Sequence, residues 1–267
     1  MATRTAIINV MAKACYKASR NLLRDFGEVE QLQTSRNGPD NFVITASNAS
    51  EGKLVEELSF ARPEYGILTK GGKSIKSNDP KQRRWIIDPL NGSRNFLHGI
   101  PHWAISIGLQ EESELVAGVI YDATRDELFW AEKGLGAYLN DTRLRVSERR
   151  ALADCLISIG EQTPQAKKVV QEHFITEINN VVSGIRYLGA DALDLAYVAA
   201  GRLDGFWKSD LSPWEMAAGI ILIKEAGGYA TDSKGGTKMM AEGAALCANA
   251  RIHHRIFQLL KVQKISC

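Results

Sequence analysis

The chain has 267 residues, of which 45% are hydrophobic and 24% are charged, and its formal net charge is +2. This composition is typical of a globular protein, and the length is sufficient for a large core and two lobes. The small net charge and the lack of a basic block with interleaved aromatic residues give no support for nucleic-acid binding.

The cysteines and the N-terminal residues indicate a cellular compartment. The four cysteines have no motif spacing, which is typical of reduced thiols in a cytosolic protein. There is no apolar N-terminal run and no apolar stretch of about 18 residues. We therefore expect neither a signal peptide nor a membrane span, and a cytoplasmic protein.

The first quarter of the chain predicts two helices, a strand and a loop. Apolar residues at helical spacing predict a helix over residues 3–25, and Ser50 is a suitable N-cap for a second helix that Pro63 ends. Residues 41–44 fit either a short strand or the edge of a turn. A short strand is expected at 66–68, followed by a flexible basic loop over 69–74.

The most informative stretch covers residues 85–93. Trp85-Ile86-Ile87 predicts a buried strand that ends at Asp88, after which Pro89 and Gly92 turn the chain. A carboxylate beside converging backbone N–H groups suits a site for a metal and a phosphate. The alternative is an ordinary Asp-Pro turn after a core strand.

The rest of the chain separates into two kinds of pattern. A loop is expected over 95–102, and three β-rich runs joined by short polar links predict an antiparallel sheet over 103–109, 115–121 and 127–132, with a hairpin at 134–141. From residue 156 the pattern alternates between strand and helix, which favours a more parallel sheet. The expected strands are 156–159, 185–188 and 205–207, and the expected helices are 163–180 and 191–200. We predict an N-terminal α+β lobe over 1–145 and a C-terminal α/β lobe over 146–267.

A second distinctive stretch begins at Ser212-Pro213-Trp214-Glu215, which fits a capping box at the start of a helix that Gly227-Gly228 ends. Capping by itself explains Glu215. The functional alternative is that the Glu215 carboxylate faces Asp88 across a cleft.

Together these stretches resemble the inositol monophosphatase family, including its bacterial branch known as the extragenic suppressor protein. The family's first motif corresponds to Asp88-Pro89-Leu90-Asn91-Gly92-Ser93, and its second to Pro213-Trp214-Glu215-Met216-Ala217-Ala218-Gly219. The segment from Ala192 to Phe206 also follows the family pattern closely. The resemblance implies an α/β fold of five layers, an α-β-α-β-α sandwich like that of fructose-1,6-bisphosphatase, and usually a homodimer.

The family's chemistry is Mg²⁺-dependent hydrolysis of a phosphate monoester such as inositol-1-phosphate, with carboxylates that hold the metal ions. The resemblance assigns a role to ten positions of this chain. The implied metal positions are Asp88, Leu90, Asn91, Glu215 and Lys70, the implied catalytic positions are Ser47, Ser93 and Asp88, and the implied substrate-binding positions are Asn91, Gly92, Ser93, Arg186 and Lys208.

Five of the family's acidic positions are substituted in this chain. The family has a Glu-Glu pair, two Asp residues and a Glu where this chain has Lys70, Gly71, Asn91, Ser47 and Lys208. Asp88 and Glu215 then face three cations, which gives a local charge of +1. Because Mg²⁺ prefers carboxylate oxygens, we expect weak or absent Mg²⁺ binding and weak or lost catalysis.

The substitutions suggest that Lys70 occupies the place of a metal ion and pairs with Asp88, while Lys208 pairs with Glu215. The pocket would then be a metal-free anion site near Gly92 and Ser93. The alternative is that both lysines are solvated. For His98 and His102, packing is favoured over metal binding.

Three functions remain open from the sequence. The chain is either a slow Mg²⁺-dependent phosphatase, a non-catalytic binding module or a metal-free sensor of a small phosphorylated metabolite. The bacterial branch implies RNA polymerase or other transcription machinery as a partner of the binding module.

Overall fold

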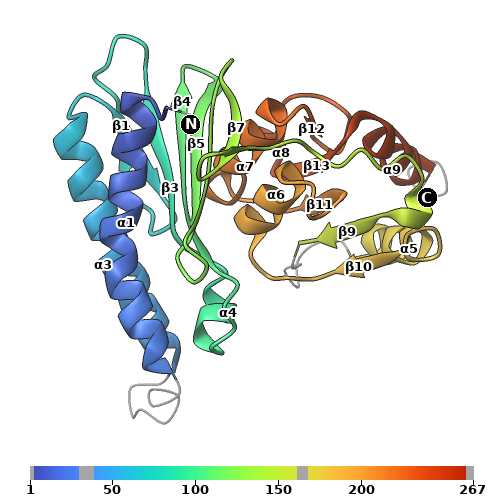
Figure 1. Ribbon diagram of the computed structural model, residues 1–267, viewed down its shortest axis with the longest axis horizontal. Coiled ribbons are helices and arrows are strands. Elements are labelled where there is room, and N and C mark those ends of the chain that lie inside the picture. The colour runs from blue at the N-terminus through green and yellow to red at the C-terminus, as the bar shows by residue number, and fades with distance from the viewer. Residues whose placement is uncertain (1–2, 30–38, 161–167, 263–267) are drawn as a thin grey trace.

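The structure is a computed structural model that describes residues 3–29, 39–160 and 168–262. Five layers lie side by side, in the order helices, sheet, helices, sheet, helices (Figure 1). The α/β sandwich that the motifs imply is therefore present. The helices of the three helical layers are α1 (Ala6–Gly27), α3 (Pro39–Ala61), α6 (Asp191–Ala199), α7 (Pro213–Glu225), α5 (Lys168–Asn179) and α9 (Ala250–Val262).

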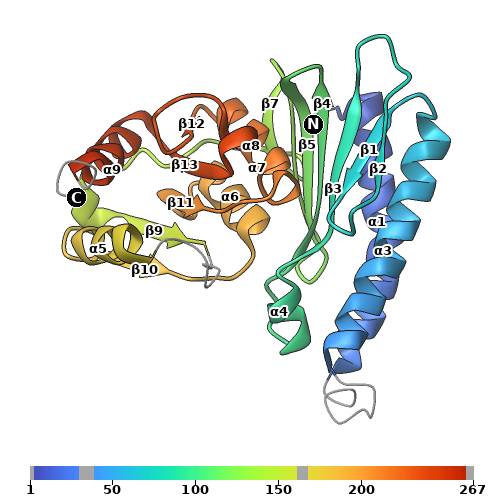
Figure 2. The ribbon, with the colours of Figure 1, turned by 180° about the vertical axis from the view of Figure 1, so that it is seen from behind.

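The larger sheet has eight strands in the order β2-β1-β3-β4-β5-β6-β7-β8, and α1 and α3 cover its outer face (Figure 2). Only the pairing of β1 with β3 is parallel, and the antiparallel sheet predicted over 103–132 is confirmed. Its strands are β1 (Gly66–Thr69), β2 (Ser74–Ile75), β3 (Arg84–Asn91), β4 (Ala104–Glu111), β5 (Glu114–Asp122), β6 (Glu127–Glu132), β7 (Gly136–Leu139) and β8 (Thr142–Arg143).

The smaller sheet has the order β10-β9-β11-β13-β12. Its first three strands are parallel, as the alternating pattern predicts, and β13 and β12 add two antiparallel pairings. Of the helix expected over 163–180, the part before residue 168 lies outside the described residues. The strands are β9 (Leu156–Ile159), β10 (Gly184–Arg186), β11 (Gly205–Ser209), β12 (Tyr229–Thr231) and β13 (Ala244–Ala248), and the short helices are η1 (Leu152–Asp154) and α8 (Met239–Glu242).

Helix α7 is buried between the two sheets, and two glycines of the larger sheet let it approach closely. A Cβ atom on Gly108 would lie 2.7 Å from the Ala217 Cβ, and one on Gly118 would lie 2.8 Å from the Ala218 Cα. The core between the sheets therefore includes side chains from both predicted lobes. The boundary at residue 145 stays a prediction.

The prediction for residues 41–50 is wrong. Residues 41–44 lie inside α3, and Ser50 is an interior residue of that helix rather than its N-cap. Ala46, Ser50, Leu54 and Leu58 are buried at every fourth position, so one continuous helical face packs on the sheet. The Ser50 hydroxyl donates to the Pro89 carbonyl at 2.9 Å instead of capping a helix.

The sequence suggested a turn at Pro89, but the chain does not turn there. Strand β3 continues to Asn91, and its pairing with β4 is irregular between Asp88 and Asn91. A proline without an N–H group is tolerated at such an irregularity because no ladder hydrogen bond is required there. The turn follows at Gly92, whose φ of +81° leads into α4 (Ser93–Leu97), where a loop was expected.

Among the described residues, no helix is both long and apolar enough to cross a membrane. Cys15, Cys155 and Cys247 are buried free thiols. Burial raises the pKa of the Cys155 thiol to about 12, so this side chain stays a neutral part of the core.

Candidate functional site

Asp88 lies at the irregular part of β3 and is fully buried. Its carboxylate accepts hydrogen bonds from the Leu90 N–H at 3.2 Å and from the Asn91 side-chain amide at 3.0 Å. The donors belong to Leu90 and Asn91, which lie two and three positions after Asp88, so the conformation of this segment holds the carboxylate in place. Asp88 follows a buried apolar run as the sequence indicates, but the strand continues through the first motif to Asn91 instead of ending at Asp88.

Lys70 follows β1, and the parallel pairing of β1 with β3 brings it beside Asp88. The Lys70 N–H donates to the Ile87 carbonyl at 3.1 Å. The Lys70 Nζ lies 3.3 Å from the Asp88 Oδ1 and 3.1 Å from the Leu90 carbonyl oxygen. A carboxylate and a carbonyl oxygen are ligands that suit a bound cation, and here they surround an ammonium group. The predicted contact between Lys70 and Asp88 is present.

Asn91 is buried and links the larger sheet to helix α6. Its side-chain N–H group donates to Asp88, and its Oδ1 accepts from the Ala192 N–H at 3.0 Å at the start of α6. Both polar groups of the amide are therefore engaged within the protein. Because the nitrogen is the group that faces Asp88, the amide presents a donor there and not a metal ligand.

The predicted pairing of Lys208 with Glu215 is wrong. The Lys208 Nζ lies 2.5 Å from the Asp191 Oδ2, and both side chains are almost completely buried. The Glu215 carboxylate accepts from the Ser212 N–H at 2.7 Å. The capping interpretation of Glu215 therefore holds, and β11 directs Lys208 toward the start of α6.

Asp191 is the functional-site residue that the sequence reasoning missed. It is the first residue of α6, beside the segment that carries the family resemblance. A lysine that is buried in a strand of the smaller sheet requires a carboxylate partner. This requirement was the signal by which Asp191 could have been identified. Burial raises the pKa of Asp191 to about 7, while Lys208 opposes that shift.

Three further predicted residues make fewer contacts at the site. Ser47 on α3 and Ser93 at the start of α4 are half-buried. Arg186 is exposed, and its guanidinium donates to the Ile185 carbonyl at 2.9 Å.

A second carboxylate that the sequence reasoning missed is that of Glu51, which accepts from the Gly71 N–H at 3.0 Å. Glu51 and Asp191 together offset the surplus of positive charge expected from the sequence.

The histidine prediction holds in part. His102 is buried, and its Nε2 lies 3.0 Å from the Asp194 Oδ1, while the Ser158 hydroxyl donates to the other Asp194 oxygen at 2.6 Å. These contacts join β9, α6 and the residues before β4, which is a packing role. His98 is exposed at the end of α4.

The side chains around Asp88 do not fit a divalent metal ion. The oxygens of Asp88 and Leu90 face the Lys70 ammonium, and Glu215 is engaged by its own helix. Within the described parts of the chain, no group of three or more His, Cys, Asp or Glu side chains is arranged to hold a metal. An ammonium 3.3 Å from Asp88 repels a divalent cation, so the donor set disfavours Mg²⁺.

We expect the ionisation of Asp191 to make folding stability depend on pH. Because its folded-state pKa of about 7 exceeds the ordinary value of 3.8, the folded protein holds more protons than the unfolded chain between these values. Stability should therefore fall as pH rises from about 4 to 7, by at most about 1.4 kcal/mol per pH unit. Urea unfolding of the wild type and Asp191→Asn across this range measures it. Equal slopes for the two proteins would contradict the assignment.

Comparisons with known proteins agree on one family. The sequence model of the inositol monophosphatase family matches residues 3–264. The inositol-1-monophosphatase of Rhizobium meliloti (strain 1021) is 48% identical over 261 residues, 97% of each chain. The Nus factor SuhB of Escherichia coli (strain K12) is 34% identical over 248 residues, 92% of each chain. The crystal structure of extragenic suppressor protein suhB from Bartonella henselae aligns with a TM-score of 0.88 at 45% identity, covering 96% of this chain and 99% of that one.

Proposed function

We infer that this chain, which belongs to the inositol monophosphatase family, no longer hydrolyses phosphate monoesters with Mg²⁺ and acts as a binding protein. The observation that carries this proposal is the Lys70 ammonium, 3.3 Å from the Asp88 carboxylate and 3.1 Å from the Leu90 carbonyl. In the family's chemistry, bound metal ions lower the pKa of the attacking water and neutralise the leaving oxygen. An ammonium group neutralises Asp88 but offers no site at which a water molecule can be activated in that way.

The first test is release of phosphate from inositol-1-phosphate at about 10 mM Mg²⁺. We expect a rate at least about a hundredfold below that of the Rhizobium meliloti relative assayed in parallel, because the metal-dependent stabilisation of the transition state is missing. The same Mg²⁺ concentration should shift the melting temperature by less than about 1 °C, since an ion that does not bind the folded state cannot stabilise it. Turnover comparable to that of the relative, or a rise of several degrees, would overturn the proposal.

We propose transcription machinery as the partner, because several relatives at 32–34% identity are named Nus factor SuhB. The protein would act in the cytoplasm as a homodimer. Binding of purified RNA polymerase to the immobilised protein tests the partner, and sedimentation equilibrium tests the dimer. If the polymerase does not bind, calorimetry with inositol-1-phosphate in the presence of EDTA tests the remaining function, a metal-free sensor of a phosphorylated metabolite.

A further inference from the structure

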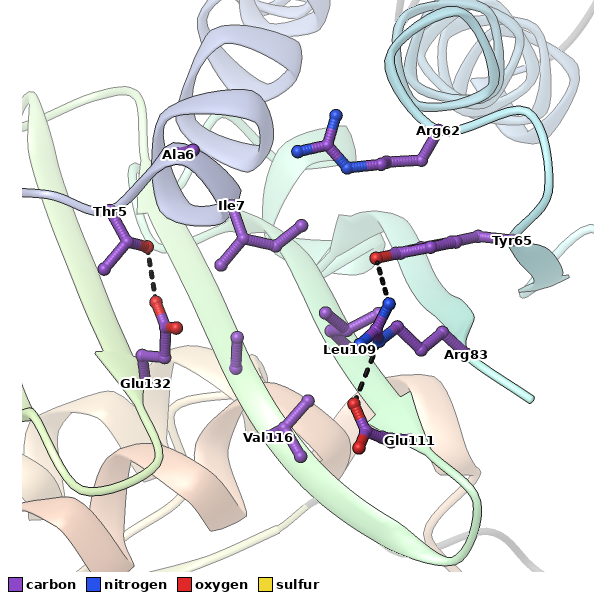
Figure 3. Close-up of a pocket in the computed structure, with 11 residues that line it drawn as sticks. Thr5, Ala6, Ile7, Arg62, Tyr65, Arg83, Leu109, Glu111, Val116 and Glu132 are labelled. Atoms are coloured by element: carbon purple, nitrogen blue, oxygen red, sulfur yellow. Dashed lines mark hydrogen bonds and ion pairs between the residues drawn. The ribbon is translucent and has the colours of Figure 1, made fainter. Parts of the chain in front are cut away.

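A second pocket, of about 360 Å³, lies on the face of the larger sheet that α1 and α3 cover (Figure 3). It borders Arg83, which directly precedes β3, and Asp88 lies five positions further along, a span of about 17 Å of extended strand. The pocket is therefore separate from the Asp88 site. Its apolar lining includes Ala6 and Ile7 from α1 and Leu109, Val116 and Ala117 from the sheet.

Two of the charged residues around this pocket neutralise each other. The Arg83 Nε donates to Glu111 at 2.9 Å, and its second nitrogen donates to the Tyr65 hydroxyl at 3.1 Å (Figure 3). The Arg83 guanidinium also lies over the Tyr65 ring, 5.5 Å from its centre. These contacts fix one wall of the pocket and leave it without net charge.

The other two charged residues, Arg62 and Glu132, do not pair. One Arg62 nitrogen donates to the Ala61 carbonyl at 2.7 Å, and no carboxylate of the described residues lies within 4.0 Å of this guanidinium. The Glu132 carboxylate accepts a hydrogen bond from the Thr5 hydroxyl, and no described lysine, arginine or histidine lies within 4.0 Å of it. Both side chains are half-buried.

Figure 3 shows the two charges on opposite sides of Ile7, with Arg62 beside Tyr65 and Glu132 beside Thr5. A pocket with a cation at one end, an anion at the other and apolar side chains between them is complementary to a molecule with the reverse arrangement. Charge-assisted hydrogen bonds are strong where the groups are partly withdrawn from water, and a few such groups on an apolar lining are typical of small-molecule sites.

We propose that this pocket binds a small zwitterion, with a carboxylate on Arg62 and an ammonium group on Glu132 joined by a short apolar chain. The Asp88 site takes no part in this binding. The ligand makes one charge-assisted contact at each end, and its methylene groups cover Ile7 and Leu109. A molecule that carries only one of the two charges leaves a half-buried charge of the protein without compensation.

Isothermal titration of the full-length protein with 6-aminohexanoate, hexanoate and hexylamine tests the proposal, with 4-aminobutanoate and 8-aminooctanoate added to vary the span. We expect at least one zwitterion to bind at least tenfold more tightly than either singly charged compound. Arg62→Gln and Glu132→Gln should each weaken that zwitterion at least tenfold, and Arg62→Lys should recover part of the loss. The matched control is Arg150→Gln, at an exposed arginine outside the pocket, which should change affinity less than twofold.

The proposal is wrong if no zwitterion of the series binds more tightly than hexanoate and hexylamine. It is also wrong if Arg62→Gln or Glu132→Gln binds the best zwitterion as the wild type does while keeping the wild-type circular dichroism spectrum. Addition of inositol-1-phosphate should leave the zwitterion affinity unchanged. Competition between the two would place the zwitterion at the Asp88 site and contradict the assignment.

Discussion

Replacement of Asp191 by alanine is expected to lower the free energy of unfolding by about 3–5 kcal/mol, because it removes the carboxylate 2.5 Å from the buried Lys208 ammonium. For a protein of this length the expected fall in melting temperature is about 10 °C. The loss exceeds that of a surface ion pair, since Lys208 is 5% exposed and Asp191 is 6% exposed. Urea unfolding at pH 8 measures the change.

The matched control is the double variant Asp191→Ala, Lys208→Met, which removes the ammonium together with its partner. Its stability should return to within about 2 kcal/mol of the wild type, because apolar replacements of a buried ion pair are often nearly neutral. The difference between the single and double variants gives the coupling energy of the pair. A single variant that loses less than about 1 kcal/mol would show that Asp191 does not hold Lys208.

Restoring the family's acidic residues is expected to create Mg²⁺ binding. The variant carries Lys70→Glu, Gly71→Glu, Asn91→Asp and Ser47→Asp, and its Mg²⁺ affinity should rise more than about a hundredfold above that of the wild type. The physical reason is the exchange of an ammonium for carboxylates beside Asp88, since unit charges at about 4 Å interact by about 4 kcal/mol even at an effective dielectric constant of about 20. Titration calorimetry and the rise of melting temperature with Mg²⁺ measure the effect.

The structure adds one steric condition to this experiment. A Cβ atom on residue 71 would lie 2.6 Å from the Glu51 Oε2, so the flexible end of Glu51 has to rotate away. The variant without Gly71→Glu is therefore the matched comparison, and Lys70→Gln shows the effect of removing the ammonium alone. If the fourfold variant folds and binds Mg²⁺ no better than the wild type, the assignment of these positions to the family's metal ligands is wrong.

Features that depend on neighbouring residues could be predicted from the sequence. Alternating β-rich runs predicted β4, β5 and β6, because the side chains of a strand alternate between two faces. Ser212 and Glu215 predicted the start of α7, because capping requires only residues within one helical turn. The apolar run before Asp88 also predicted the buried strand that carries this carboxylate.

The family resemblance suggested the contact between Lys70 and Asp88, but the other pairings between distant elements became visible only in the fold. Asn91 accepts a hydrogen bond from Ala192, which lies 101 positions away in the chain. Lys208 pairs with Asp191 and not with Glu215, although all three lie in the same region of the chain. Such contacts depend on strand register and on where a helix begins relative to a sheet, and no local pattern records them. The same holds for Arg62 and Glu132, which only the packing of α3 over the larger sheet brings to opposite sides of one pocket.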